Sequence, residues 1–283
     1  MDPLHAACLD VFGSVPGRVA RLHGGDLSDV ARVQLENGQV VVAKQGPMVA
    51  REARMLEAIA AAEVPVPQVL AIAGEVLFLE ALDERRAAPS HWAKFGEDLA
   101  RLHACAGDAY GWHEDYAFGT VMIYNAPSGH GPDRGPDRGP EKGPGDWPGF
   151  WAERRLLPFV AQMERGLGAR LETLAGRLGE LLPAAPAPGL LHGDLWSGNL
   201  LATQDAIHLI DPACYFGDGE VDLAMLNLFG GPGPGFAEGY GALQPGWETR
   251  RAVYSLFPAL VHLRLFGAGY RAMVERFLED AGA

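Results

Sequence analysis

The chain has little cysteine, little lysine and no long hydrophobic run. Its 283 residues include 3 cysteines, which lie far apart and form no CxxC pair. That spacing argues against both a disulfide framework and a thiolate zinc site. Glycine, proline and polar residues interrupt every uncharged stretch well before the ~20 apolar residues that a membrane span needs. Because residues 1–3 do not begin a signal peptide either, we expect a cytoplasmic protein that does not bind membranes.

Positive charge is also scarce. There are 23 Lys and Arg residues against 36 Asp and Glu residues, a formal net charge of -13. This negative charge repels nucleic acid and anionic membranes. A phosphate ligand therefore has to be bound by residues close to it, and we expect a divalent metal to help bind it. Lysine occurs only at Lys44, Lys94 and Lys142. Since Lys44 ends an apolar strand-like run, it is a candidate functional residue.

The first 80 residues have the pattern of a small sheet with one helix. Asn37-Gly38 between two apolar runs predicts a hairpin, because both turn positions favour positive φ. The apolar spacing after Pro47 predicts a helix that ends before Pro65. The predicted strands cover residues 18–22, 30–35, 40–44, 69–73 and 76–80. We therefore predict an N-terminal lobe at residues 1–83.

The remainder is predicted to be largely helical, which gives a C-terminal lobe at residues 84–283 and a two-lobed α+β fold. The expected helices cover residues 89–105, 149–164, 168–182, 220–229 and 247–280, the last split near Gly267 and Gly269. Residues 126–148 form a Gly/Pro-rich insertion in which Gly-Pro-Asp-Arg occurs twice. With almost no apolar side chain to bury, this insertion is predicted to be a flexible loop.

The most informative motif is HGDLWSGN at residues 192–199, followed by an apolar run and Asp211-Pro212. Two strand-like pieces flank a polar loop, which is predicted to bring Asp194, Asn199 and Asp211 to one rim. Phosphoryl transfer needs a carboxylate to orient and deprotonate the acceptor hydroxyl and oxygen ligands to hold Mg²⁺. Asp194 suits the first role, whereas Asn199 and Asp211 suit the second. The spacing matches the catalytic loop and metal-binding Asp of protein-kinase-like folds.

The N-terminal lobe offers matching residues. In a kinase-like lobe, a strand lysine reaches the α- and β-phosphates of ATP and a helix glutamate holds it there. Lys44 and Glu52 occupy these places. We also predict nucleotide contacts from Gly24 and Gly25, in the turn between the first two strands, and from Glu80 at the end of the last strand.

The chain resembles the fructosamine kinase (ketosamine-3-kinase) family, within the aminoglycoside and choline kinase group. HGDLWSGN with Trp196, DPACYFGDGEVDLAML and LFPALVHLRLFGAGY carry the resemblance, and it extends to GGDLSDV, FGEDLARLHA, YGWHED and FWAERRLLP. The family's usual Pro-Gln-x-Asn stretch is not retained, although Asn125 remains after Gly119-Thr120. The resemblance therefore covers nearly the whole chain and implies a bilobal protein-kinase-like fold with ATP held between the lobes.

The resemblance also implies site roles. Asp194 would be the catalytic base, Asn199 and Asp211 would bind Mg²⁺, and Lys44 with Glu52 would bind the ATP phosphates. The reaction would phosphorylate the third-carbon hydroxyl of a ketosamine, whose product releases its amine, so the implied role is deglycation.

Candidate acceptor contacts are Trp196, His192 and Asn125. We interpret Asp222 as a carboxylate that supports the catalytic loop, and Glu220 as a helix cap.

Three other functions remain open from the sequence. An aminoglycoside or other small-alcohol kinase would use the same motifs, and the acidic chain would suit a cationic acceptor in either case. A pseudokinase would keep the fold without turnover. A zinc hydrolase built on His192, Asp194, His208 and Asp211 is the weakest alternative, since these spacings are not those of zinc proteases.

Overall fold

The structure is a computed structural model that describes residues 2–22, 29–126 and 146–283. Its contacts divide the chain into two compact units. The first unit contains residues 1–102, 197–213 and 233–241, and the second contains the remainder. Both units therefore combine segments that are distant in sequence. The lobe boundary expected after residue 83 stays a prediction.

A five-stranded antiparallel sheet forms the centre of the first unit, in the order β1-β2-β3-β5-β4. Its strands are β1 (Pro16–Arg21), β2 (Asp29–Leu35), β3 (Val40–Gln45), β4 (Val69–Ala73) and β5 (Val76–Glu80). The predicted β2–β3 hairpin is present, and Gly38 in its turn has φ of 89°. All five predicted strands are confirmed to within two residues at each end.

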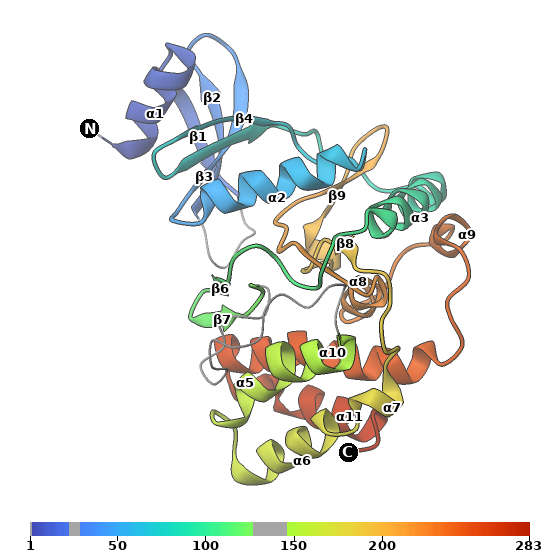
Figure 1. Cartoon of the computed structure of the whole chain (residues 1–283). Helices are drawn as coiled ribbons and strands as arrows, with labels where there is room; N and C mark the ends of the chain where they lie inside the picture. The colour runs from blue at the N-terminus through green and yellow to red at the C-terminus, as the bar shows by residue number, and fades with distance from the viewer. Residues whose placement is uncertain (1, 23–28, 127–145) are drawn as a thin grey trace. The chain divides into compact units, whose positions relative to one another are not determined.

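Helices cover both faces of this sheet. Alternate residues of a strand point to opposite faces, and the buried residues follow that alternation. Val33, Val41 and Phe78 pack with helix α1 (Pro3–Phe12) on one face. On the other face, Leu77 and Leu79 pack with helix α2 (Val49–Ala61), which lies along the sheet (Figure 1).

Helix α1 was not predicted, although Asp2 caps its first turn and Pro3 follows, a typical helix start. The Asp2 carboxylate accepts a hydrogen bond from the Leu4 N–H at 3.2 Å. Cys8, on the same helix, is fully buried in the sheet core.

The first unit also contains parts of the later chain. Helix α3 (Pro89–Ala104) begins in it, and helix α9 (Phe236–Tyr240) packs on α3. A hairpin of β9 (Leu200–Ala202) and β10 (Ile207–Leu209) follows a single 3₁₀ turn. The Leu209 N–H donates to the Pro65 carbonyl at 2.9 Å, which ties this hairpin to the segment after α2.

The second unit is mainly helical, as predicted. Two short antiparallel pairs join its helices: β6 (Tyr116–Phe118) with β7 (Val121–Ile123), and β8 (Gly189–Leu191) with β11 (Tyr215–Gly217). Its helices are α4 (Trp147–Trp151), α5 (Leu157–Val160), α6 (Arg165–Ala175), α7 (Leu178–Leu181), α8 (Glu220–Leu226), α10 (Trp247–Phe266) and α11 (Arg271–Asp280). The predicted split near Gly267 is confirmed, whereas the single helix expected over residues 168–182 is two helices, α6 and α7, separated after Gly176.

Arg155 is a fully buried cation in the core of the second unit. It lies on a π-helix (Ala152–Leu156) between α4 and α5. Its guanidinium donates to the Tyr124 carbonyl at 2.7 Å and to Asn125 Oδ1 at 2.5 Å. The guanidinium carbon also lies 4.4 Å from the Tyr215 ring centroid, with two phenylalanine rings at 5.0 Å. Hydrogen bonds and aromatic faces thus replace water around the charge.

Replacing Arg155 with methionine is expected to lower the free energy of unfolding by about 2–4 kcal/mol, because the buried Asn125 side-chain oxygen and the half-buried Tyr124 carbonyl lose their donor. Thermal or urea unfolding would measure this loss. Arg154→Met, one residue earlier on the same π-helix, is the control and is expected to change stability by less than about 0.5 kcal/mol. Equal stability of the two variants would contradict a structural role for the Arg155 hydrogen bonds.

No helix in the described residues is both long enough and apolar enough to cross a membrane.

Candidate functional site

Lys44 lies at the centre of a buried ion-pair cluster in the first unit. Strand alternation places it on the same face of β3 as Val42, the face that packs against α2. Glu52 lies in the first turn of α2, and its Oε1 is 2.6 Å from Lys44 Nζ. Asp211 Oδ1 is also 2.6 Å from the same nitrogen. The structure thus brings together three residues that are predicted to bind ATP and metal.

The Lys44 side chain carries its charge in a nearly dry environment, since the residue is 4% exposed. Burial alone would lower the pKa of Lys44, but the facing carboxylates of Glu52 and Asp211 raise it above its ordinary value. The ammonium therefore stays protonated. Burial also raises the pKa of Glu52, although the Lys44 ammonium opposes that effect.

Asn199 and Asp211 are brought together by the β9–β10 hairpin. Leu200 pairs with Leu209 in this hairpin, so the residue before β9 and the residues after β10 meet at one end. The Ile210 N–H donates to the Asn199 carbonyl at 3.1 Å, which fixes that juxtaposition. Asp211 has φ of 55°, a left-handed conformation that Asp tolerates better than most residues. A short hairpin thus presents both predicted metal ligands within the same unit.

The donor set of this hairpin fits Mg²⁺. Mg²⁺ is usually bound through one or two carboxylates and completes its coordination with water and substrate phosphates. Asp211 offers a carboxylate, and Asn199 offers an amide oxygen. Within the described ranges, no cluster of three or more His, Cys, Asp or Glu side chains is arranged to hold a metal ion.

The predicted base, Asp194, lies in the second unit in a loop that follows β8. Its own N–H lies 3.3 Å from His192 Nδ1, and its carbonyl accepts the Trp196 N–H at 3.1 Å. Gly193 has φ of 82°, so the turn immediately before Asp194 needs a residue without a Cβ. Asp194 is half-buried, whereas His192 is fully buried. The loop therefore leaves the Asp194 residue partly open to solvent.

Asp222 supports this loop from helix α8, as interpreted from the sequence. Its carboxylate is fully buried and accepts the backbone N–H groups of His192 at 2.7 Å and of Gly193 at 2.9 Å. His103 Nε2 lies 3.2 Å from the same carboxylate. Because backbone donors hold both oxygens, Asp222 fixes the backbone on the N-terminal side of Asp194.

Asp222→Asn is expected to lower the free energy of unfolding by about 1.5–3 kcal/mol. The substitution replaces one of the two carboxylate oxygens with an amide NH₂ group, which cannot accept a hydrogen bond. The turnover number should fall as well, because the backbone before Asp194 loses an anchor. Thermal unfolding and steady-state kinetics would measure the two effects. Asp280→Asn changes an exposed carboxylate at the end of α11 and serves as the control. A variant at Asp222 that behaves like this control would argue against the anchoring role.

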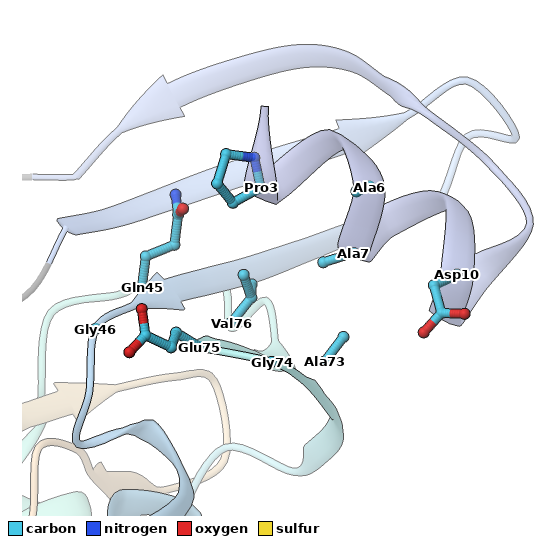
Figure 2. A pocket seen from close by; sticks show the side chains of 10 residues that line it. All are labelled: Pro3, Ala6, Ala7, Asp10, Gln45, Gly46, Ala73, Gly74, Glu75 and Val76. Carbon is cyan, nitrogen blue, oxygen red and sulfur yellow. The ribbon is translucent and has the colours of Figure 1, made fainter. Parts of the chain in front are cut away.

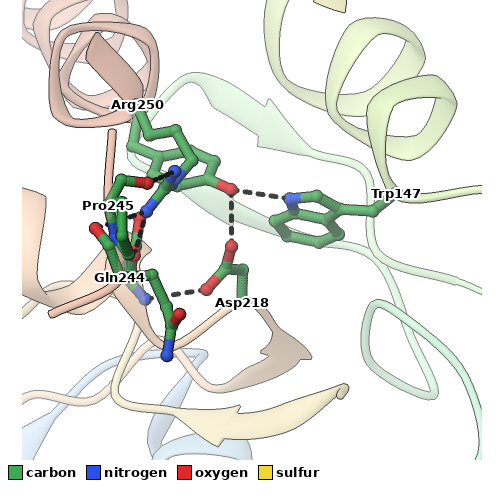
Figure 3. Close-up of polar contacts among 7 residues, drawn as sticks. Trp147, Asp218, Gln244, Pro245 and Arg250 are labelled. Carbon is green, nitrogen blue, oxygen red and sulfur yellow. Dashed lines mark hydrogen bonds and ion pairs between the residues drawn. The ribbon is translucent and has the colours of Figure 1, made fainter. Parts of the chain in front are cut away.

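A polar network holds the start of α8 in the second unit (Figure 3). The Trp147 indole N–H donates to the Tyr254 hydroxyl at 2.9 Å, and that hydroxyl donates to Asp218 Oδ2 at 2.7 Å. Burial, reinforced by the Asp218 charge, raises the pKa of Tyr254, which keeps its hydroxyl protonated as a donor. Glu220 does not cap the helix by a side-chain bond; it forms two ion-paired hydrogen bonds with Arg250, at 2.6 and 2.7 Å. These contacts position α8 and therefore Asp222.

The remaining predicted residues are distributed over both units. Glu80 is exposed at the end of β5, where its Oε2 accepts the Gln68 N–H at 3.3 Å. Asn125 is fully buried, and its side-chain oxygen accepts from Arg155. Trp196 is 38% exposed. Gly24 and Gly25, together with residues 127–145 of the predicted insertion, lie outside the described residues, whereas Trp147 and Pro148 at its end are buried in α4. The roles of all these residues stay predictions.

A shallow pocket of about 480 Å³ lies elsewhere in the first unit, between α1 and the turn that joins β4 to β5 (Figure 2). Gln45 and Glu75 lie at one end of it and Asp10 at the other. None of the predicted site residues lines this pocket.

Comparisons with known proteins give a consistent result. A family model described as fructosamine kinase matches residues 14–282. A probable ketoamine kinase of Thermus thermophilus is 37% identical over 282 residues, which cover 95% of this chain and 96% of that protein. A probable ketoamine kinase of Synechocystis is 35% identical over 252 residues, 84% of this chain and 80% of that one.

Solved structures agree with the sequence comparisons. A candidate fructosamine-3-kinase of Thermobifida fusca superposes with a TM-score of 0.84 at 29% identity, with 99% of each chain covered. A macrolide 2'-phosphotransferase of Brachybacterium faecium gives a TM-score of 0.60 at 18% identity, with 98% of each chain covered. The α+β, protein-kinase-like fold predicted from the sequence is thereby confirmed.

Proposed function

Because the chain belongs to the fructosamine kinase family and is thus a phosphotransferase with an alcohol acceptor, we propose that it transfers the γ-phosphoryl group of ATP to the third-carbon hydroxyl of a ketosamine. The observation that carries this proposal is the buried Lys44–Glu52–Asp211 cluster beside Asn199. It provides a fixed positive charge for phosphate oxygens and two oxygen ligands for a metal. Membership of this family also excludes the zinc-hydrolase alternative.

In the proposed reaction, the side chains of the protein hold the substrates in place, and one of them accepts a proton. Lys44 binds the α- and β-phosphates, and Glu52 holds its ammonium in place. Asn199 and Asp211 would hold Mg²⁺, which would offset the charge of the triphosphate. Asp194 accepts the proton of the acceptor hydroxyl as the new oxygen–phosphorus bond forms and the bond between the γ-phosphorus and the β–γ bridging oxygen breaks. The products are ADP and a phosphorylated ketosamine.

Trp196 is proposed to contact the acceptor sugar. Sugars present apolar C–H faces that stack on aromatic rings, and Trp196 lies two residues after Asp194 with its ring partly exposed. The buried His192 and Asn125 support the acceptor site through the loops that carry them. The resulting phosphate ester is unstable and releases the free amine, so the proposed biological role is the deglycation of proteins or amines in the cytoplasm.

Product mass spectrometry tests the proposed function. The protein is incubated with Mg-ATP and a mixed panel of fructosyl- and ribulosyl-amines, aminoglycosides and choline-like alcohols. Phosphate on ketosamines alone supports the proposal. Phosphate on an aminoglycoside or a simple alcohol would keep the reaction class and replace the acceptor. ATP bound without any phosphorylated product would favour a pseudokinase.

A further inference from the structure

Five aromatic side chains form a continuous row in the second unit. We name Trp196, Phe229, His262, Phe266 and Tyr270 the aromatic row. They come from the loop that follows β8, the segment after α8, the last turns of α10 and the 3₁₀ turn before α11. No residue of the row was singled out from the sequence except Trp196.

The rings of the aromatic row contact one another in sequence along the surface. The ring centroids of Trp196 and Phe229 are 6.0 Å apart at an interplanar angle of 76°. Those of Phe229 and His262 are 5.3 Å apart, and His262 lies 5.4 Å from Phe266 and 5.0 Å from Tyr270. These separations are typical of edge-to-face and tilted aromatic pairs. The rings therefore support one another in fixed orientations.

Three of the five residues in the row are exposed, whereas His262 and Tyr270 are half-buried. The exposed fractions of Trp196, Phe229 and Phe266 are 38%, 39% and 48%. Isolated exposed apolar side chains are ordinary, and Leu157 and Leu243 are such cases here. A connected group of aromatic rings at the surface is different, because contiguous exposed apolar surface is a feature of ligand-binding sites.

The position of the row indicates what it binds. It begins at Trp196, whose N–H donates to the carbonyl of the proposed base, Asp194, at 3.1 Å. The row continues from Trp196 over four further rings, so it offers more aromatic surface than the single ring proposed to contact the sugar.

On the basis of the proposed function, we propose that the aromatic row is an extended acceptor subsite that selects ketosamines whose amine bears an aromatic group. The protonated secondary amine of a ketosamine is attracted to aromatic faces. An aromatic group beyond that nitrogen gains further contact with Phe266 and Tyr270. His262 is held between these rings and Phe229 by a 2.8 Å hydrogen bond between its Nδ1 and the Pro258 carbonyl, which fixes the orientation of its ring.

The test compares two acceptors that differ only beyond the nitrogen: the fructosamines of ethylamine and of 2-phenylethylamine. For each protein, the measured quantity is the ratio of kcat/KM for the phenylethyl compound to kcat/KM for the ethyl compound. The wild-type ratio is expected to be at least about 10, and Phe266→Ala or Tyr270→Ala should lower it about tenfold. Leu157→Ala removes an exposed apolar side chain outside the row and should leave the ratio unchanged. A wild-type ratio near 1, or an unchanged ratio in both row variants, would overturn the proposal.

Calorimetric binding separates this subsite from the proposed function. If the wild-type protein phosphorylates neither fructosamine, the proposed function fails. The Kd values of the two compounds then still show whether the aromatic row binds the aromatic group. Tighter binding of the phenylethyl compound that is lost in Phe266→Ala supports the subsite. Equal Kd values for the two compounds, or for wild type and Phe266→Ala, refute it.

Discussion

Replacing Asp194 with asparagine is expected to lower kcat by at least about a hundredfold while the Kd for ATP changes by less than about twofold. Asparagine has nearly the same shape as aspartate but cannot accept the proton of the acceptor hydroxyl. Lys44, proposed to bind the ATP phosphates, and Asn199 and Asp211, proposed to bind Mg²⁺, are unaltered. Steady-state kinetics with Mg-ATP and calorimetric binding of ATP would measure the two quantities separately.

The control for Asp194→Asn is Asp108→Asn, which makes the same chemical change at an exposed residue of the second unit. It is expected to retain the wild-type kcat and Kd. Wild-type turnover by Asp194→Asn would disprove the role of Asp194 as the base. A loss of ATP binding equal to the loss of turnover would instead indicate that Asp194 acts through the structure of its loop.

Replacing Lys44 with methionine is expected to reduce kcat/KM for ATP by at least about thirtyfold. Hydrogen bonds to charged groups contribute about 1.5–3 kcal/mol each, and methionine keeps the length of the side chain while removing the charge. The change also leaves the carboxylates of Glu52 and Asp211 facing each other without a cation, so the melting temperature should fall as well. Kinetics, ATP calorimetry and thermal unfolding would be measured on the same preparation.

Two further variants help to interpret the result for Lys44→Met. Lys94→Met removes an exposed lysine of the same unit, and we expect wild-type kinetics because Arg101 still pairs with the partner of Lys94, Asp98. Glu52→Gln keeps the Lys44 charge and removes one of its two carboxylate partners, so its kcat/KM should lie between those of wild type and Lys44→Met. Unchanged ATP kinetics in Lys44→Met would exclude a phosphate contact.

The parts of the site that sequence could predict are those set by local rules. Strand alternation places Lys44 on the face of β3 that α2 covers, and one helical turn brings Glu52 opposite it. Asn199 and Asp211 flank a short hairpin, and antiparallel pairing joins the two ends of any such hairpin. In each case, the spacing along the chain determines which side chains meet.

The parts that sequence missed depend on contacts between distant segments. Arg155 meets Asn125 across 30 residues, and a π-helix, for which the sequence gives no periodic signal, places it there. In the aromatic row, His262 and Phe266 follow helical spacing on α10, but Trp196 and Phe229 come from segments far away in the sequence. Glu220 was predicted as a cap because it opens α8, yet Arg250 from α10 binds its side chain. Tertiary packing decides each of these arrangements.

The buried cysteines provide a way to measure how often each unit opens. Cys8 is fully buried in the first unit and Cys214 in the second. Burial raises the pKa of both thiols, so neither reacts readily while its unit stays closed. The rate at which a thiol reagent modifies each cysteine under native conditions therefore reports how often that unit opens, without any added label.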